Sequence, residues 1–300
     1  MTVAEQYLMG AGSDELDRML FQGRMFRPEA ERLLRRCGPG PDTRAIDVGC
    51  GPLGIMDLLS EHVGPGGEVV GIDVQPGMLD LARRLVAERG LTNVRLVEGD
   101  AAESGEAPGG FDFVHTRLVL MNVPHSAAVL AAMVALARPG GTVAVQDVDW
   151  ISRVCDPPHP AWNRLVDAIT ELWRLNGMDV LLGRRLPRLL REAGLTDIGV
   201  DAGIRVFQHD HPYQTLLVDR AELCRDALVE RGLIGHDELD GTIGELRAHL
   251  ADPGTIVVHP TLFQAWGRVP EVNEVTGVSD VSGVSDLPDA ADPSDVTEGA

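Results

Sequence analysis

Residues 44–54 read Arg-Ala-Ile-Asp-Val-Gly-Cys-Gly-Pro-Leu-Gly, and this stretch decides the fold. The apolar run that ends at Val48 predicts a strand, and the glycines that follow it predict a tight turn into a helix. Glycine suits this turn because the backbone can bend sharply there and approach a ligand that a Cβ atom would block. A tight turn without any ligand is the plainer interpretation, so the surrounding sequence has to decide between the two.

Strand-like and helix-like segments alternate from Arg44 to Val148, which predicts a parallel sheet with helices on both faces. Strands are expected at 44–49, 68–74, 94–98, 111–115 and 142–148, and helices at 55–63, 76–89 and 126–138. Two later strands are expected at 196–207 and 262–269. The fold class we predict is therefore α/β, with a Rossmann-like, seven-stranded, mostly parallel sheet and a helical cap formed by insertions.

The alternation also predicts a division of the chain into parts. We expect residues 1–30 to form an N-terminal helical segment, 31–150 the ligand-binding core, and 151–183 with 213–258 the cap. Residues 184–212 and 259–270 complete the core sheet. Residues 271–300 hold eight acids and no base and repeat Gly-Val-Ser-Asp, so we expect a disordered acidic tail.

Charge and composition exclude several classes of function. The net charge is −20, and removing the eight acids of the tail still leaves −12, so we expect no nucleic-acid partner. No apolar run is long enough to span a membrane and no signal peptide is evident, so we expect a cytoplasmic protein without a membrane partner. The four scattered cysteines and the short His209-Asp-His211 run predict no metal site. A homodimer is left open.

Two acids follow the glycine loop at positions that favour a nucleoside ligand. Asp73 ends the second expected strand, 19 residues beyond Gly54, where a carboxylate can accept both hydroxyl groups of a ribose. Asp100 follows the third strand, where it faces an adenine edge. Asp47 stands inside the first strand, where a carboxylate would repel a pyrophosphate but attract an ammonium group. Asp47 therefore disfavours a nicotinamide dinucleotide, although Asp73 suits the ribose of that ligand as well.

Five blocks of the chain resemble the class I methyltransferases, particularly the branch that includes ubiquinone and menaquinone biosynthesis enzymes and many small-molecule methyltransferases. They are DVGCGPLG (47–54), GIDVQPGMLDLA (71–82), VEGDAAE (97–103), FDFVHTRLVLMNVP (111–124) and LARPGGTVAVQD (136–147). The resemblance covers about residues 30–150 and implies S-adenosylmethionine as cofactor and a small-molecule methyl acceptor. The acidic or Asn residue followed by two prolines and an aromatic ring, typical of DNA amino-group methyltransferases, is absent at 121–124.

The resemblance also implies a set of cofactor-binding residues. Asp47 and the backbone of Gly49 and Gly51 would hold the methionine part of the cofactor. Asp73, with Val74, would hold the ribose, Asp100 and the Ala101 backbone the adenine, and Leu118 would line the adenosyl pocket. In similar enzymes an N-terminal segment folds over the cofactor, so Tyr7 and Gln22 are candidates to bind the methionine carboxylate. The alternative is that both lie on an ordinary surface helix.

Candidate proton acceptors stand where the fourth and fifth strands are expected to end. His115 and Asp149 are the candidate catalytic residues, because ligands of open α/β sheets bind at the carboxyl ends of the strands. A non-catalytic role is the alternative for each. Among the cap residues, Arg153, Arg164 and Arg174 are candidates to bind an anionic acceptor, although charged residues on such helices usually face water.

Three functions remain open at this point. The leading one is S-adenosylmethionine-dependent methyl transfer to O, N or C of a small molecule, in bacterial specialised metabolism. The second is a protein of the same fold that binds S-adenosylmethionine and catalyses a different reaction. The third is a nicotinamide-dependent oxidoreductase, which shares the glycine loop and the ribose-binding acid.

Overall fold

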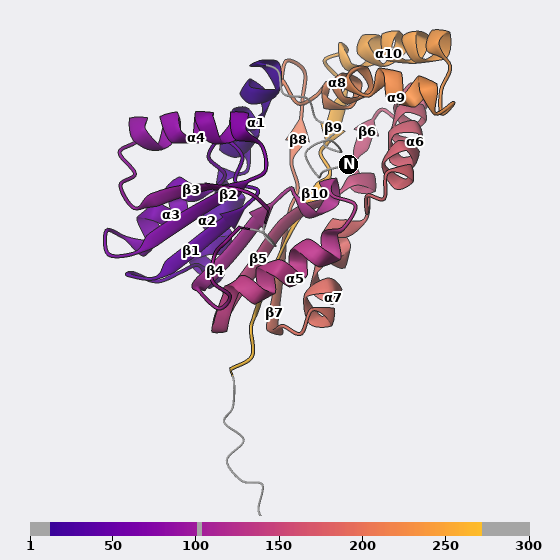
Figure 1. Cartoon of the computed structure of the whole chain (residues 1–300). Helices are drawn as coiled ribbons and strands as arrows, with labels where there is room; N and C mark the ends of the chain where they lie inside the picture. Colours follow the sequence, from indigo (N-terminus) through magenta and orange to yellow (C-terminus); the bar gives the residue numbers. More distant parts are fainter. Residues whose placement is uncertain (1–12, 101–103, 272–300) are drawn as a thin grey trace, which may run out of the picture.

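A computed structural model describes residues 13–100 and 104–271 of the chain. One seven-stranded sheet runs through it in the order β3-β2-β1-β4-β5-β10-β7 (Figure 1). Its strands are β1 (Arg44–Val48), β2 (Glu68–Asp73), β3 (Val94–Glu98), β4 (Phe111–Arg117), β5 (Ala137–Asp149), β7 (Thr196–Gly203) and β10 (Thr261–Arg268). Within this sheet β10 is antiparallel to both of its neighbours and the other pairs are parallel. The prediction of a mostly parallel α/β sheet is confirmed.

Helices cover both faces of the sheet, because the buried strands place apolar side chains on both sides. Ala45 and Phe113 pack in one cluster with α2 (Arg27–Cys37), α3 (Met56–Val63) and α4 (Pro76–Glu88). The next residues along the same strands, Ile46 and Val114, pack in the other cluster with α5 (Ser126–Leu136) and α7 (Leu182–Glu192). This alternation holds the central strands rigidly between two apolar layers.

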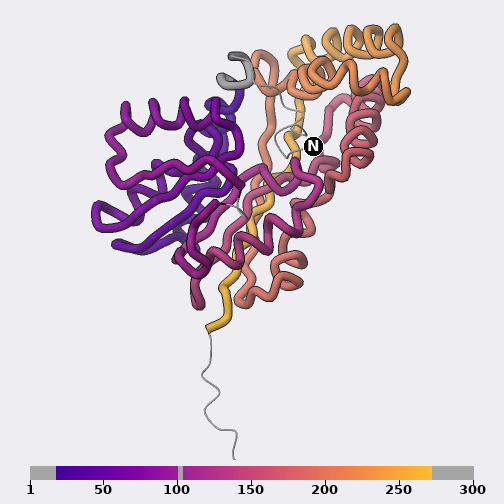
Figure 2. The backbone as a smooth tube through the Cα atoms, in the orientation of Figure 1, coloured from indigo at the N-terminus to yellow at the C-terminus, as the bar shows by residue number. Residues whose placement is uncertain are grey.

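A cap of helices lies beyond one edge of the sheet. Its helices, which pack on one another, are α6 (Pro160–Leu175), α8 (Leu216–Leu223), α9 (Arg225–Glu230) and α10 (His236–Leu250). Leu165, Ile169 and Leu172 form the buried face of α6. Figure 1 shows α8, α9 and α10 gathered at the end of the molecule away from α2 and α3, with α6 beside them. Figure 2 shows the chain rising into the cap after β7 and returning as β10.

A small second sheet joins the cap to the core. It contains β6 (Val154–Asp156), β9 (Ile256–Val258) and β8 (Val206–Phe207), paired antiparallel in that order. The sequence predicted one strand over 196–207, but the structure has two, β7 and β8, in different sheets. The strands β6 and β9 were not predicted, because three residues are too few to show a period of two.

The described N-terminal part is the helix α1 (Ser13–Met25), which is followed directly by α2. Two single turns, η2 (Leu120–Asn122) and η3 (Trp150–Ser152), follow β4 and β5. None of the helices in the described ranges is long and apolar enough to cross a membrane. Tyr7, Ala101 and the acidic segment from residue 272 onward lie outside the described residues.

Candidate active site

The central parallel strands end at one edge of the sheet, and the residues that follow them line a single pocket. Gly49, Val74, Asp100, Leu118 and Trp150 come directly after β1, β2, β3, β4 and β5 or within two residues of their ends. With its open mouth included, the pocket encloses about 1470 Å³. A crevice at the carboxyl ends of the strands is where α/β folds of this kind bind their ligands.

The Asp47 carboxylate holds the glycine loop in place. Its Oδ2 accepts a hydrogen bond from the backbone N–H of Ile55, at 3.0 Å, and so fixes the start of α3. Gly54 has a φ of +56°, and a Cβ atom at that position would collide with the Asp47 carboxylate. Glycine is therefore required there for two reasons, the left-handed backbone and the close approach of the carboxylate. Asp47, Gly49 and Gly51 line a second hollow beside the pocket.

Asp73 ties the end of β2 to the same loop. Its carboxylate accepts hydrogen bonds from the backbone N–H groups of Gly51, at 2.8 Å, and Gln75, at 2.9 Å. Burial raises the pKa of Asp73 above its ordinary value, and these two hydrogen bonds oppose that rise. Asp73, Val74 and Asp100 all line the pocket.

Leu118 lies in a strained turn directly after the carboxyl end of β4. Its φ is +57°, a value that non-glycine residues rarely adopt. Two hydrogen bonds hold the turn, from Leu118 N–H to the Gln146 carbonyl and from Asn122 Nδ2 to the Leu118 carbonyl, both at 2.8 Å. Leu118, the residue with this strained backbone, therefore lines the pocket.

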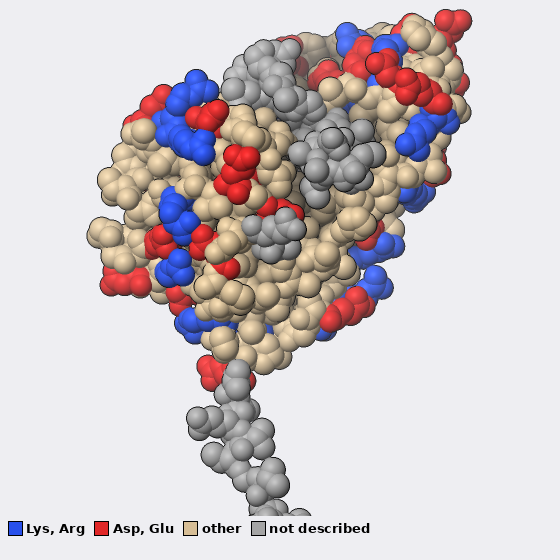
Figure 3. All heavy atoms as spheres, in the orientation of Figure 1, with Lys and Arg blue, Asp and Glu red and all other residues tan. Residues whose placement is uncertain are grey.

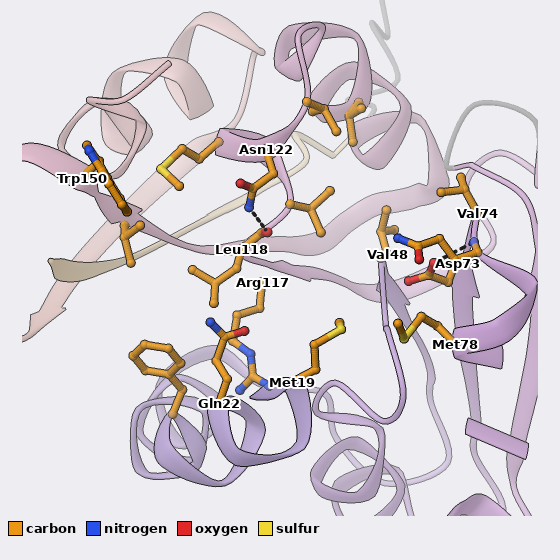
Figure 4. A pocket seen from close by; sticks show the side chains of 18 of the residues that line it. Met19, Gln22, Val48, Asp73, Val74, Met78, Arg117, Leu118, Asn122 and Trp150 are labelled. Atoms are coloured by element: carbon orange, nitrogen blue, oxygen red, sulfur yellow. Dashed lines mark hydrogen bonds between the residues drawn. The ribbon is translucent and has the colours of Figure 1, made fainter. Parts of the chain in front are cut away.

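Gln22 and Met19 reach the pocket from α1, below Leu118 in the view of Figure 4. Arg117, the last residue of β4, meets them there and donates a hydrogen bond from Nη2 to the Gly54 carbonyl, at 3.1 Å. Its Nη1 is buried and has no hydrogen-bond partner within residues 13–100 and 104–271. Sequence analysis missed Arg117 because the fourth strand was expected to end at His115, two residues too early.

His115 does not face the pocket, so the expectation that placed it there as a proton acceptor is wrong. It lies inside β4 and is fully buried. Its Nδ1 is hydrogen-bonded to Asp47 Oδ1, at 2.8 Å, and its Nε2 lies 3.2 Å from Gln146 Oε1. Both ring nitrogens are therefore engaged with protein groups, and the ring holds the Asp47 carboxylate in place.

Asp149 is also turned away from the pocket. It is the last residue of β5, and the pleat of the strand directs its neighbours Val148 and Trp150 to the pocket instead. Asp149 is buried and forms an ion pair with Arg184. Asp147 is fully buried and accepts hydrogen bonds from the backbone of Met121 and Val148, and burial raises its pKa to about 7.

The cap closes the other end of the pocket with residues from four separate segments. Trp150 follows β5, Trp173 lies on α6, Arg220 on α8, and His259 follows β9. The two indole rings pack against each other with centroids 3.9 Å apart, and Trp150 Nε1 donates a hydrogen bond to Thr170. Arg153 was a candidate from the sequence, which had no signal for Arg220 or His259.

Comparison with known proteins assigns the family. Residues 39–194 match the family described as "Methyltransferase domain", which is more than half of the chain. Nocamycin O-methyltransferase of Saccharothrix syringae is 39% identical over 120 residues, which cover 40% of this chain and 43% of that protein. Demethylmenaquinone methyltransferase of Listeria monocytogenes is 33% identical over 143 residues, covering 48% of this chain and 56% of that one. This chain thus spans about half the length of these relatives.

Solved structures agree on the fold. A putative methyltransferase from Bacillus halodurans superposes with a TM-score of 0.55 at 16% identity, over 80% of this chain and 98% of that one. The YcgJ protein from Bacillus subtilis gives a TM-score of 0.53 at 16% identity, over 80% and 97%. The sheet, its glycine loop and the pocket at its carboxyl edge define a class I methyltransferase fold. The chain belongs to the methyltransferase domain family.

Proposed function

We propose that this protein transfers a methyl group from S-adenosylmethionine to O, N or C of a small-molecule acceptor. The observation that carries the proposal is one continuous pocket that begins at the glycine loop, passes Asp73 and Leu118, and ends between Trp150 and the cap. Its first part is built from the segments that carry the family resemblance, and its second part comes from the insertions. The donor is thus assigned to the loop end and the acceptor to the cap end.

The residues present fit S-adenosylmethionine. Each oxygen of Asp73 accepts a backbone hydrogen bond, and a carboxylate oxygen can accept a further one from a ribose hydroxyl group. The buried Nη1 of Arg117, for which the described part of the chain offers no hydrogen-bond partner, is a donor suited to the methionine carboxylate. Gln22 is a second donor on the same side, and Asp47 lines the adjoining hollow, where it would attract the ammonium group.

Bound S-adenosylmethionine supplies an electrophilic methyl group on a positively charged sulfur. The chain has to hold donor and acceptor in line and exclude water, and such positioning can supply most of the acceleration. His115 and Asp149 are already engaged elsewhere in the fold, so we assign the removal of a proton to neither. We propose instead that transfer relies on positioning and on an acceptor atom that is already nucleophilic.

The pocket and the surface favour a small acceptor. On the face shown in Figure 3, acidic and basic side chains are interspersed, without the continuous basic field that a nucleic acid requires. The net charge of −20 adds to this argument. We therefore propose a bacterial, cytoplasmic enzyme of specialised metabolism that acts on neither nucleic acid nor membrane. A homodimer stays a prediction.

Methyl-labelled S-adenosylmethionine tests the proposal. The protein is incubated with the labelled donor and the fraction below 3 kDa of a bacterial culture extract, and labelled small molecules are separated by chromatography. We expect a labelled product that forms with the wild type and is absent with Gly51→Val. Tight binding of S-adenosylhomocysteine without any label transfer would contradict methyl transfer while leaving the cofactor assignment in place.

A further inference from the structure

The cap end of the pocket contains buried positive charge. Arg153 and Arg220 both line the pocket, and each is only 7% exposed. Within the described ranges no carboxylate forms an ion pair with Arg153, and the nearby charge that acts on it is Arg220. A buried guanidinium without an anion is costly, since desolvation is not offset by a favourable charge. This arrangement is unusual in a chain of net charge −20.

Arg153 is held in one orientation by Trp150. Its guanidinium carbon lies 3.2 Å from the centre of a Trp150 ring, and its Nε donates a hydrogen bond to the Trp150 carbonyl, at 3.1 Å. Its Nη2 is buried and has no hydrogen-bond partner among the residues that the structure describes. Burial and Arg220 lower the pKa of Arg153 well below its ordinary value. The ring stacking explains the orientation of the side chain, but it leaves this donor unsatisfied.

His259 adds a neutral group to the same end of the pocket. Its Nδ1 donates a hydrogen bond to the Pro260 carbonyl, at 2.8 Å, so the lone pair of the neutral ring is on Nε2. Burial, Arg153 and Arg205 lower the pKa of His259 to about 3. The imidazole is therefore uncharged at neutral pH, and the charge of this end comes from the two arginines that line it.

We infer that the methyl acceptor carries an oxyanion, a carboxylate or a phosphate, which Arg153 binds with Arg220 beside it. The planar fork of a guanidinium matches both groups, and an anion here would satisfy Nη2 and offset the burial of the charge. The paired indole rings of Trp150 and Trp173 supply an apolar wall for the body of the same molecule. The inference rests on the proposed function and assigns the substrate class of that same site.

Three probes that share a phenyl ring test the inference: benzoate, phenyl phosphate and the neutral benzamide. Each is titrated into the full chain saturated with S-adenosylhomocysteine, and the fluorescence of Trp150 and Trp173 reports binding. Because hydrogen bonds to a charged group are strong, we expect the better anion to bind about 10- to 100-fold more tightly than benzamide. Preference for benzoate identifies a carboxylate, and preference for phenyl phosphate identifies a phosphate.

Variants separate Arg153 from the general charge of the cap. Arg153→Gln should reduce the preference for the anion to within about threefold of benzamide, whereas Arg153→Lys, which keeps the charge, should retain part of it. The matched control is Arg174→Gln on the exposed side of α6, which should behave as the wild type. Equal binding of the three probes, no binding of either anion, or an unchanged preference in Arg153→Gln would each overturn the inference. Binding of S-adenosylhomocysteine is measured first. If the protein does not bind it, the result counts against the proposed function and not against the inferred acceptor class.

Discussion

The two ends of the pocket differ in both charge and construction. The loop end carries Asp47 and Asp73, and the oxygens of both carboxylates accept hydrogen bonds from the backbone. The cap end carries Arg153 and Arg220 beside paired indole rings. One end is thus built to meet hydroxyl and ammonium groups, and the other to meet an anion with an apolar body. The difference assigns a separate substrate to each end and makes the two ends separately testable.

The largest effect is expected from Gly51→Val at the loop end. Gly51 has a φ of +52°, and a Cβ atom there would lie 2.9 Å from Met19 Cε. A branched side chain would strain the loop and fill the space that the cofactor needs. We expect no measurable binding of S-adenosylmethionine by calorimetry, with circular dichroism that matches the wild type. Wild-type affinity in the variant would show that the cofactor binds elsewhere.

Asp73→Asn should have the next largest effect. Asn keeps the size of the side chain but loses the charge that strengthens hydrogen bonds to a ribose, which costs about 1.5–3 kcal/mol of binding free energy, or roughly 10- to 100-fold in affinity. Asp73→Ala should weaken binding further, because it also releases the Gly51 N–H that shapes the loop. If the two variants bind S-adenosylhomocysteine as tightly as the wild type, the ribose assignment is wrong.

The contrast between the ends also explains what could be predicted from the sequence. Asp47, Gly49 and Gly51 are neighbours in the chain, so one strand–loop–helix unit positions them, and local pattern was enough to identify it. Arg153, Arg220 and His259 come from distant segments that meet only through the cap and the small sheet, and no local pattern connects them. The prediction for His115 was wrong for a related reason. The register between neighbouring strands decides that its side chain faces Asp47, and the residue type does not reveal that register.

His259→Asn tests the environment of His259 in the cap through the pH dependence of the free energy of unfolding. In the unfolded chain this histidine takes up a proton near pH 6.5, whereas in the folded protein burial, Arg153 and Arg205 lower its pKa to about 3. Between these values the unfolded chain binds the extra proton, so the free energy of unfolding falls as the pH falls from 6.5. The ring of Tyr213 also packs against this histidine.

In the His259→Asn variant the unfolded chain cannot take up this proton at position 259. The Asn side chain can still donate a hydrogen bond to the Pro260 carbonyl. From pH 6 to pH 4 we therefore expect the wild type to lose stability more steeply than His259→Asn, by up to about 1.4 kcal/mol per pH unit. Urea unfolding at several pH values measures the difference. Parallel curves for the two proteins would mean that His259 titrates normally in the folded state.

The smallest effect is expected from Thr170→Val, which leaves Trp150 Nε1 without its acceptor at the cap end. Because Trp150 is buried, the loss of this hydrogen bond should lower the free energy of unfolding by about 1 kcal/mol. The affinity for S-adenosylhomocysteine should stay within about twofold, since the loop end is untouched. A large loss of cofactor affinity in Thr170→Val would show that the two ends are not independent.

A crystal structure with S-adenosylhomocysteine would show which end of the pocket holds the donor. The account predicts electron density for the ribose against Asp73 and for the adenine against Asp100. It also predicts the sulfur facing the space between Leu118 and Trp150, with Arg153 left for the acceptor. Density for the nucleoside against Arg153 and Arg220, or none at the glycine loop of a saturated crystal, would contradict it.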